Sequence, residues 1–384
     1  MTTTINNKNK KPNVPNLRFP EFQGEWEKCK LGELTTKVGS GSTPKGGNAV
    51  YTSVGHCFVR SQNVGMGYLI LDDIAHIDDD IHKKHKATEL SEDDVLLNIT
   101  GASIGRTAIA TKEIEGGNVN QHVCIIRANS KVSPKFLCNY IQTKKIQNYI
   151  RSLQTGGSRE GLNFDQIRSF PISLPSIAEQ NKIAQLLDKL NERIATQNKI
   201  IDKLQSLIKG IAQNIVRNNK PNVRLSECLE CKSSTLQESE VCEQGTYPVY
   251  GANGIVGYLD NYSTEGEAIY IIKDGSGVGT VSYVKGKCSA TGTLNTLQAK
   301  EDYSLQYLYY LLKVFNFEPY KTGMAIPHIY FKDYGKAKVF CPSYIEQLRY
   351  ARLLSAIDNK LSAEQHLLTN LSLQKQYLLR QMFI

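Results

Sequence analysis

Two short segments of the chain carry residue types that could bind a metal ion. Cys228 and Cys231 form a CxxC pair with Cys242 nearby, but zinc would need a fourth ligand, and His328 is the only histidine within the next hundred residues. Residues 78–85 combine carboxylates with histidines, but their alternating charge is typical of a solvated loop. We therefore expect the nine cysteines to be reduced thiols, and we assign no metal-binding residue.

The glycine-rich segments do not match nucleotide-binding loops. Residues 39–47 (GSGSTPKGG) lack the GxxxxGK[ST] order of a phosphate-binding loop. Residues 275–279 (GSGVG) are followed by a strand-like run, where a dinucleotide-binding fingerprint requires a helix. We interpret the second segment as a tight turn and assign no cofactor-binding or catalytic residue to this chain.

Another set of polar residues is suited to binding nucleic acid. Arg, Lys, Gln and Asn can form paired hydrogen bonds with base edges, while Ser, Thr and backbone amides bind phosphates. The candidates in the first half of the chain are Arg60, Gln62, Asn63, Ser103, Arg106, Gln154, Ser158 and Arg159. Those in the second half are Lys273, Ser276, Lys285, Lys321, Thr322 and His328. Each of them taken alone is more readily explained as an ordinary residue of a solvated turn.

An internal repeat relates the two halves. The hexapeptides PSIAEQ and PSYIEQ begin at Pro175 and Pro342, a shift of 167 residues. The same shift relates Thr155-Gly156 to Thr322-Gly323, and a shift of 174 relates the turn at 103–105 to that at 277–279. The chain is therefore one globule-plus-helix unit written twice. No pair of nucleophile and base recurs in both copies, which favours a binding protein over an enzyme.

Each copy ends in a segment with a coiled-coil period. Residues 175–217 and 342–384 have apolar positions in alternating steps of four and three, from Ile183 and from Tyr350 onward. Gln197 and Glu364 interrupt the two series at equivalent central positions and are expected to fix the register of the pair. Packing two copies of one unit about a two-fold axis predicts antiparallel helices with a globule at each end.

The composition fits this organisation. A chain of 384 residues predicts two domains, and 46 basic against 37 acidic residues give a net charge of +9. No apolar run reaches the roughly 18–20 residues of a membrane helix, and a cytoplasmic location is expected. Strands are predicted at 94–100, 106–112 and 122–128, with one helix after Ser133 and one after Ser304. The fold class is α+β, with two mixed, strand-rich globular domains and an antiparallel coiled coil. We expect a disordered tail at 1–16, globular domains at 17–174 and 218–341, and long helices at 175–217 and 342–384.

Several motifs resemble those of one protein family, the specificity subunits of type I restriction–modification enzymes. They are the opening LRFPEF at 17–22 with Trp26 and LGE at 31–33, the two EQ-containing runs, and TYPVYGANGIVGYLD at 246–260 followed by DGSGVGTV. The resemblance spans nearly the whole chain and keeps the order of target recognition domain, conserved helix, target recognition domain and conserved helix.

The resemblance implies a non-catalytic subunit that reads a bipartite site on double-stranded DNA, with helices that set the spacing. Two adenine-methylating subunits and the restriction/translocase subunits would be its partners. S-adenosylmethionine, ATP and Mg would belong to those partners. Two alternatives are a coiled-coil assembly scaffold without direct base readout and an enzyme in its own right; the second would need catalytic groups that we do not find in the sequence.

Overall fold

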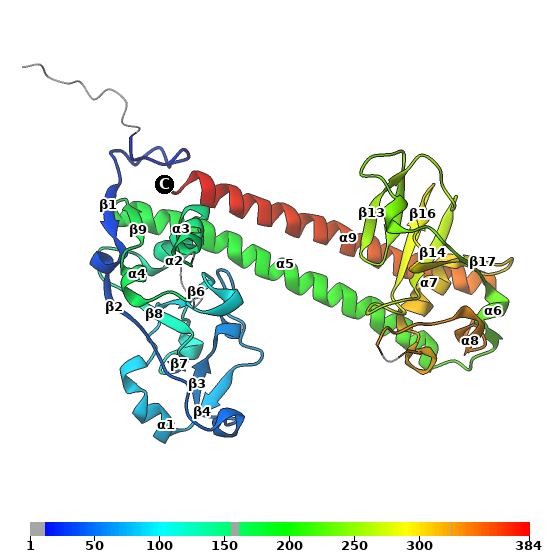
Figure 1. Ribbon diagram of the computed structural model, residues 1–384, viewed down its shortest axis with the longest axis horizontal. Coiled ribbons are helices and arrows are strands. Elements are labelled where there is room, and N and C mark those ends of the chain that lie inside the picture. Colours follow the sequence, from blue (N-terminus) through cyan, green and yellow to red (C-terminus); the bar gives the residue numbers. More distant parts are fainter. Residues whose placement is uncertain (1–11, 155–160, 324) are drawn as a thin grey trace, which may run out of the picture. The chain divides into compact units, whose positions relative to one another are not determined.

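The computed structural model describes residues 12–154, 161–323 and 325–384 of the chain. Its contacts divide it into two units, and Figure 1 labels many of their helices and strands. Unit 1 comprises residues 1–196 with 368–384, and unit 2 comprises residues 197–367. No helix formed by the described residues combines the length and the apolar character of a membrane span.

Three small sheets form the globular part of unit 1. The largest has the strand order β2-β8-β5-β6, and all its neighbours are antiparallel. Its strands are β2 (Thr35–Ser40), β8 (Val123–Ala128), β5 (Val95–Asn98) and β6 (Thr107–Ile109). The others are β4-β3-β7, with β4 (Ala75–Ile77), β3 (His56–Val59) and β7 (Asn118–Val119), and the pair β1 (Glu27–Lys30) with β9 (Pro171–Leu174).

Unit 2 has the same three sheets. The largest has the order β11-β17-β14-β15, formed by β11 (Leu229–Ser233), β17 (Leu294–Ala299), β14 (Glu267–Ile272) and β15 (Val281–Lys285). The others are β13-β12-β16, with β13 (Gly254–Leu259), β12 (Tyr247–Gly251) and β16 (Ser289–Ala290), and the pair β10 (Val223–Arg224) with β18 (Lys338–Val339). In both three-stranded sheets the middle strand has one antiparallel and one parallel neighbour. The α+β class, the internal repeat and the three predicted strands are confirmed.

Helices cover these sheets in both units. Unit 1 has α1 (Asp79–Lys84), α2 (Pro134–Gln142), α3 (Lys144–Gln154) and α4 (Phe164–Arg168), and unit 2 has α6 (Leu225–Cys228), α7 (Leu305–Val314) and α8 (Phe331–Tyr334). The single helix predicted after Ser133 is two helices, because Thr143 has an extended backbone and interrupts the run. The long helices are α5 (Ile177–Arg217) and α9 (Tyr344–Gln381).

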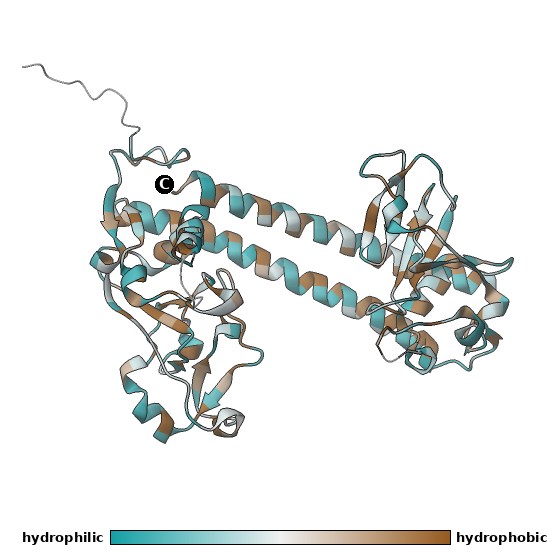
Figure 2. Cartoon of the chain, viewed as in Figure 1, coloured by the Kyte–Doolittle hydropathy of each residue, from teal (hydrophilic) through white to brown (hydrophobic). Residues whose placement is uncertain are grey.

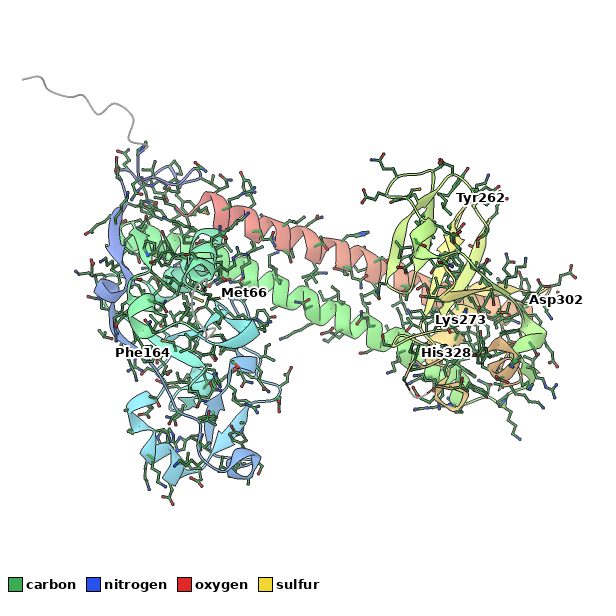
Figure 3. All side chains as sticks on the ribbon, in the orientation of Figure 1. Met66, Phe164, Tyr262, Lys273, Asp302 and His328 are labelled. Atoms are coloured by element: carbon green, nitrogen blue, oxygen red, sulfur yellow. The ribbon has the colours of Figure 1, made fainter. Side chains whose placement is uncertain are left out.

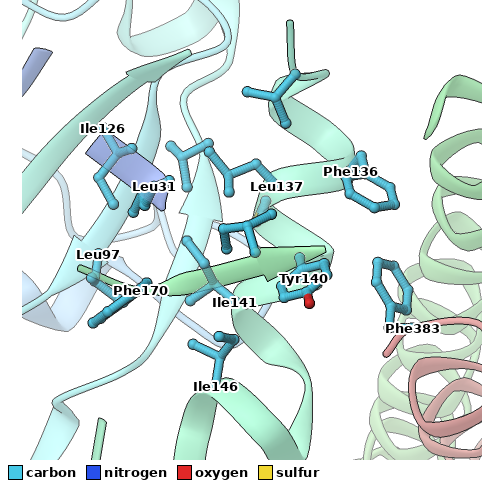
Figure 4. Close-up of a cluster of buried hydrophobic side chains, with 14 of the residues drawn as sticks. Leu31, Leu97, Ile126, Phe136, Leu137, Tyr140, Ile141, Ile146, Phe170 and Phe383 are labelled. Atoms are coloured by element: carbon cyan, nitrogen blue, oxygen red, sulfur yellow. The ribbon is translucent and has the colours of Figure 1, made fainter. Parts of the chain in front are cut away.

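The core of unit 1 joins distant parts of the chain. Phe383, just after α9, packs against Phe136 and Tyr140 of α2, with ring centroids 5.2 and 5.6 Å apart (Figure 4). The Tyr140 hydroxyl accepts from the Ser173 backbone N–H and donates to the Ile384 carbonyl, both at 2.9 Å. Burial of a Phe side chain contributes about 1.5–3 kcal/mol. The C-terminal residues therefore hold the end of α9 beside the start of α5.

The repeated EQ motif has a clear structural role. In unit 1, Gln180 accepts from the Ser133 backbone N–H at 2.8 Å and donates to the Pro175 carbonyl at 2.9 Å. In unit 2, Gln347 accepts from the Ser304 backbone N–H and donates to the Pro342 carbonyl, both at 2.9 Å. Both glutamines are buried. Each therefore ties the start of a long helix to the start of α2 or α7.

In unit 1 a residue of the LRFPEF motif adds a further contact at the start of α5. The Arg18 guanidinium forms two hydrogen bonds with the Glu179 carboxylate, at 2.8 and 2.7 Å, and Glu179 is 1% exposed. The corresponding Glu346 is exposed and accepts from the Ser343 hydroxyl instead. A buried carboxylate needs such a partner, so Arg18 and Glu179 depend on each other.

The long helices pair in opposite directions in both units. In unit 1, Ile183, Leu187 and Leu190 of α5 share one buried cluster with Leu371 and Leu378 of α9. Hydrophobic and hydrophilic residues alternate in short steps along both helices (Figure 2). Because Tyr140 holds the end of α9 beside the start of α5, the pairing is antiparallel, as the internal repeat predicted.

In unit 2 the polar layer forms between the two predicted residues. Gln197 donates to the backbone carbonyl of Glu364 at 3.0 Å and also to its carboxylate. Hydrogen bonds from Lys360 and then Gln197 hold the pKa of Glu364 below its usual value. These contacts place one residue of α5 opposite one residue of α9, although a role in setting the register stays a prediction.

The predicted tail differs from the structure at its end. Residues 1–11 lie outside the described residues, but Asn13 both accepts from and donates to the Trp26 backbone, at 2.8 and 2.5 Å. Asn16 donates to the Gln381 side chain, and the Leu17 backbone N–H to the Gln381 carbonyl. The disorder prediction was wrong for residues 13–16, because the polar asparagines bond to neighbouring backbone and side-chain groups and Pro15 is buried.

Replacing Gln347 or Gln180 by Ala should destabilise the unit that contains it by about 1–3 kcal/mol, since a buried backbone N–H and a carbonyl lose their partner. Chemical unfolding followed by circular dichroism measures this. The exposed Gln374→Ala variant on α9 serves as control and should stay within about 0.5 kcal/mol of the wild type. An equal, small effect of all three substitutions would contradict the role of the EQ motif.

Candidate nucleic-acid interface

The same tight turn closes the β5–β6 and β14–β15 hairpins. In unit 1, Gly105 donates its backbone N–H to the Asn98 carbonyl, and in unit 2 Gly279 donates to the Ile272 carbonyl, both at 2.9 Å. These glycines have φ of 86° and 90°, in the left-handed region where other residues are strained. A side chain at Gly279 would also collide with Phe317. The turn predicted at 275–279 is confirmed.

A second segment lies against each turn. In unit 1, Thr100 forms a β-bridge with Gly161, and in unit 2 the equivalent Asp274 forms one with His328. The next residues repeat the match, since the Leu162 backbone N–H donates to the Ile99 carbonyl and that of Ile329 to the Lys273 carbonyl, both at 2.9 Å. We call each pair of turn and bridged segment the turn frame of its unit. Ser158 and Arg159 lie outside the described residues.

In unit 2 the turn frame brings a lysine, an aspartate and a histidine together. The Asp274 carboxylate accepts from Lys273 Nζ and bonds His328 Nδ1, both at 2.6 Å. Burial alone would raise the pKa of Asp274, but the hydrogen bonds from Lys273 and His328 outweigh it and hold the pKa below its usual value. The network therefore stabilises unit 2 at neutral pH and loses this contribution as the pH falls through the folded pKa.

Other candidates of unit 2 surround this network or lie apart from it. Thr322 exchanges two backbone hydrogen bonds with His328, Lys321 pairs with Glu318 at 2.5 Å, and Ser276 is exposed in the turn. Lys285 lies at the other end of the β14–β15 hairpin, paired with Glu267 at 2.8 Å. Four residues of a strand span about 13 Å, so Lys285 does not belong to the turn frame. Its role as a DNA-binding residue stays a prediction.

In unit 1 a buried asparagine brings two predicted segments together. Asn98 donates to the Ser61 carbonyl at 2.8 Å and to the Ser103 hydroxyl at 3.1 Å. The short 3₁₀ turns Ser61–Asn63 and Gly101–Ser103 are therefore neighbours. Arg106 is exposed beside them, and no described residue pairs with its guanidinium. Gln154 is the last residue of α3.

Three predicted residues of unit 1 are engaged within the protein. Asn63 is 1% exposed, accepts from the Arg60 backbone N–H at 3.0 Å and donates to the Ile70 carbonyl at 2.9 Å. Its amide closes the 60–70 loop, and a role in reading bases stays a prediction. Arg60 and Gln62 both donate to Asp73, at 3.3 and 2.9 Å from its carboxylate. Only Gln62 of the three is exposed.

Sequence reasoning missed a polar pair in the turn frame of unit 1. Thr100 Oγ1 lies 2.5 Å from His122 Nδ1, and Gln121 Nε2 lies 3.4 Å from His122 Nε2. Gln121 also accepts from the Thr43 backbone N–H at 3.0 Å. The sequence signal for this pair was the polar run NQH at 120–122, directly before a buried strand. Of these three residues only His122 was part of a prediction, as the first residue of a strand.

The thiols and acidic residues do not form a metal centre among the described residues, where no group of three possible ligands is found. Cys228 is buried with its Sγ 3.8 Å from that of Cys341, and burial raises the pKa of Cys231 to about 11. In the 78–85 segment, His82 bonds the Asn118 side chain, and His85 bonds the Ile81 carbonyl.

Comparison with known proteins decides the family. The pattern described as type I restriction modification DNA specificity domain matches this chain twice, at residues 23–206 and 219–373. The chain belongs to this family. The specificity subunit is 24% identical over 299 residues to the Escherichia coli type I restriction enzyme EcoprrI specificity subunit, covering 71% of this chain and 73% of that one. It is 25% identical over 165 residues to the E. coli EcoBI specificity subunit, covering 41% of this chain and 33% of that one.

Solved structures agree on the fold of the specificity subunit. The S subunit of the type I restriction–modification system from M. genitalium superposes with a TM-score of 0.67 at 18% identity, over 97% of this chain and 99% of that chain. A chain from a study of complex assembly and conformational transition of a type I system gives 0.51 at 16% identity, over 92% and 96%. As in that family, this chain is a non-catalytic subunit of a type I restriction–modification system.

Asn63→Ala should lower the stability of unit 1 by about 1–3 kcal/mol, because the Arg60 N–H and the Ile70 carbonyl lose their partner. Thermal unfolding of the full chain measures it. Gln62→Ala, one residue away but exposed, should change stability by less than about 0.5 kcal/mol. A stable Asn63→Ala protein would mean that this amide does not hold the loop.

Proposed function

We propose that this chain is the subunit that reads DNA sequence, with each unit reading one half of a bipartite target. The observation that carries the proposal is that both units build the same turn frame but present different side chains in it. Thr100 corresponds to Asp274, and Arg106 to Thr280. One frame with two sets of hydrogen-bonding groups is suited to two different base sequences.

The charge and residue types of the frames support contact with a duplex. The chain carries a net charge of +9, and Arg106, Lys273 and Lys321 lie in or beside the frames. Lysine and arginine neutralise phosphates, and the release of counterions makes such binding strongly dependent on salt. The amides and hydroxyls of Gln121, Ser276 and Thr322 add groups that bond base edges or phosphates.

The long helices would set the spacing of the half-sites and dock two methyltransferase subunits. Several large apolar side chains on α5 and α9 point away from the paired faces and are exposed. They are Ile200, Leu207, Leu353 and Leu367 in unit 2 and Leu373 and Tyr377 in unit 1. A protein partner docked on the helices would cover these exposed side chains. The restriction/translocase subunits would join this complex, and S-adenosylmethionine, ATP and Mg would be bound by the partners, in keeping with the absence of a phosphate-loop motif in this sequence.

The alternative is an assembly scaffold that uses the same helices without reading bases. Retardation of duplex DNA by the complex of this chain with its methyltransferase subunits, measured between 50 and 200 mM salt, separates the two. A complex that reads DNA and contacts six or more phosphates should lose about 10³-fold or more in affinity for the duplex over that range. Weak binding without a salt slope would favour the scaffold.

Exchanging residues 225–338 for the matching domain of another specificity subunit should change one half of the recognised sequence and leave the other unchanged, because the turn frame of unit 1 is untouched. Mapping of methylated adenines across a genome measures both halves. The reciprocal exchange of residues 31–168 is the matched control and should change the other half. A change in both halves after either exchange would contradict reading by separate units.

Inserting one heptad into each of α5 and α9, in register, should lengthen the gap between the half-sites. Seven residues add about 10 Å of helix, which equals about three base pairs of duplex. The same methylation map measures the gap. Three heptads add about 31 Å, close to one duplex turn, and so keep both half-sites on one face. An unchanged gap after both insertions would mean that the helices do not set the spacing.

A further inference from the structure

Each turn frame holds one histidine at the same place. The second residue after the buried strand β5 or β14 bonds an imidazole Nδ1, through the Thr100 hydroxyl at 2.5 Å and the Asp274 carboxylate at 2.6 Å. Thr100 and Asp274 are equivalent in the repeat, since both form the β-bridge to the neighbouring segment. The two units therefore present a ring at matching positions.

The two histidines reach this place from different parts of the sequence. His122 precedes β8, where unit 2 has Thr293, and His328 lies in the bridged segment, where unit 1 has Gly161. A copied residue would occupy equivalent positions in both units. The imidazole is therefore not part of the repeat itself, which favours a role in what the frames do over one in how the shared fold is built.

The contacts of His328 leave one ring nitrogen available. A carboxylate only accepts hydrogen bonds, so Asp274 fixes the proton on Nδ1 and directs Nε2 away from itself. Lys273 bonds the other carboxylate oxygen and prevents the carboxylate from turning. The His328 side chain is 36% exposed, and none of the described residues bonds its Nε2. Figure 3 shows Lys273 and His328 together in unit 2.

The equivalent ring of unit 1 is held from both sides. Thr43 donates to Gln121 Oε1, so the Gln121 amide N–H₂ faces His122 and donates to its Nε2. His122 then carries its proton on Nδ1 and donates to the Thr100 hydroxyl. In this frame the exposed Gln121, and not the ring, presents the outermost group.

The geometry points to His328 as a specificity-determining residue of unit 2, oriented by Asp274 as a positioning residue, whose Nε2 bonds one base edge in the major groove. This inference rests on the proposed function and names the side chain behind one position of the half-site. A single ring nitrogen makes one hydrogen bond, so we expect it to specify one base pair.

The test compares two amide substitutions in the full chain, produced with its methyltransferase subunits and used to select sequences from a randomised duplex library. The amide of His328→Gln reaches the position of Nε2, whereas that of His328→Asn reaches only that of Nδ1. His328→Asn should lose preference by about tenfold or more at one position of the half-site read by unit 2. His328→Gln should keep most of it, and Asp274→Asn should weaken preference at that same position.

The half-site read by unit 1 is the internal control. His366 is an exposed histidine of α9, and the matched variant His366→Ala should leave the preferences in both halves unchanged. Wild-type preferences at every position in His328→Asn would overturn the inference. Loss of both half-sites by both His328 variants would assign the ring a structural role and also overturn it. A wild-type complex that selects no bipartite sequence would instead refute the proposed function, and this inference with it.

Discussion

The buried amides of Gln180 and Gln347 are the contacts on which both units depend. Each bonds the backbone at the start of α2 or α7 and the proline carbonyl before α5 or α9. Since the sheets pack on α2 and α7, this joint fixes the sheets relative to the start of the long helix. In unit 1 Arg18 strengthens it through Glu179.

Unit 1 is also closed by residues from the far end of the chain. Phe383 fills the core beside Phe136, and the Ile384 carbonyl accepts from Tyr140. Unit 1 therefore includes the last part of α9, and unit 2 includes the last part of α5. In unit 1 the paired helices and the globular part share one buried core.

The turn frames show how a duplicated fold acquires two different surfaces. Among the described residues their backbone hydrogen bonds are the same in both units, and both turns end on a glycine, at 105 and 279, which adopts the left-handed φ without strain. The side chains that project from them differ at equivalent positions. Backbone identity with side-chain difference is what two half-sites of unlike sequence require, and it allows one surface to change while the fold persists.

The sequence by itself determined the features that depend on local spacing. The heptad steps of α5 and α9, the turn at 275–279, the internal repeat and the α+β class were all predicted, because helix period, glycine φ and self-similarity are properties of neighbouring residues. Only the tertiary structure decided which polar side chains are available. Gln62 and Asn63 are adjacent and equally polar, yet a 3₁₀ turn exposes the first and buries the second. Asp274 and His328 meet across 54 residues, and Thr100 and His122 across 22, because separate segments bridge beside one turn. Hydrogen bonds between such distant residues follow from strand pairing, which local spacing does not specify.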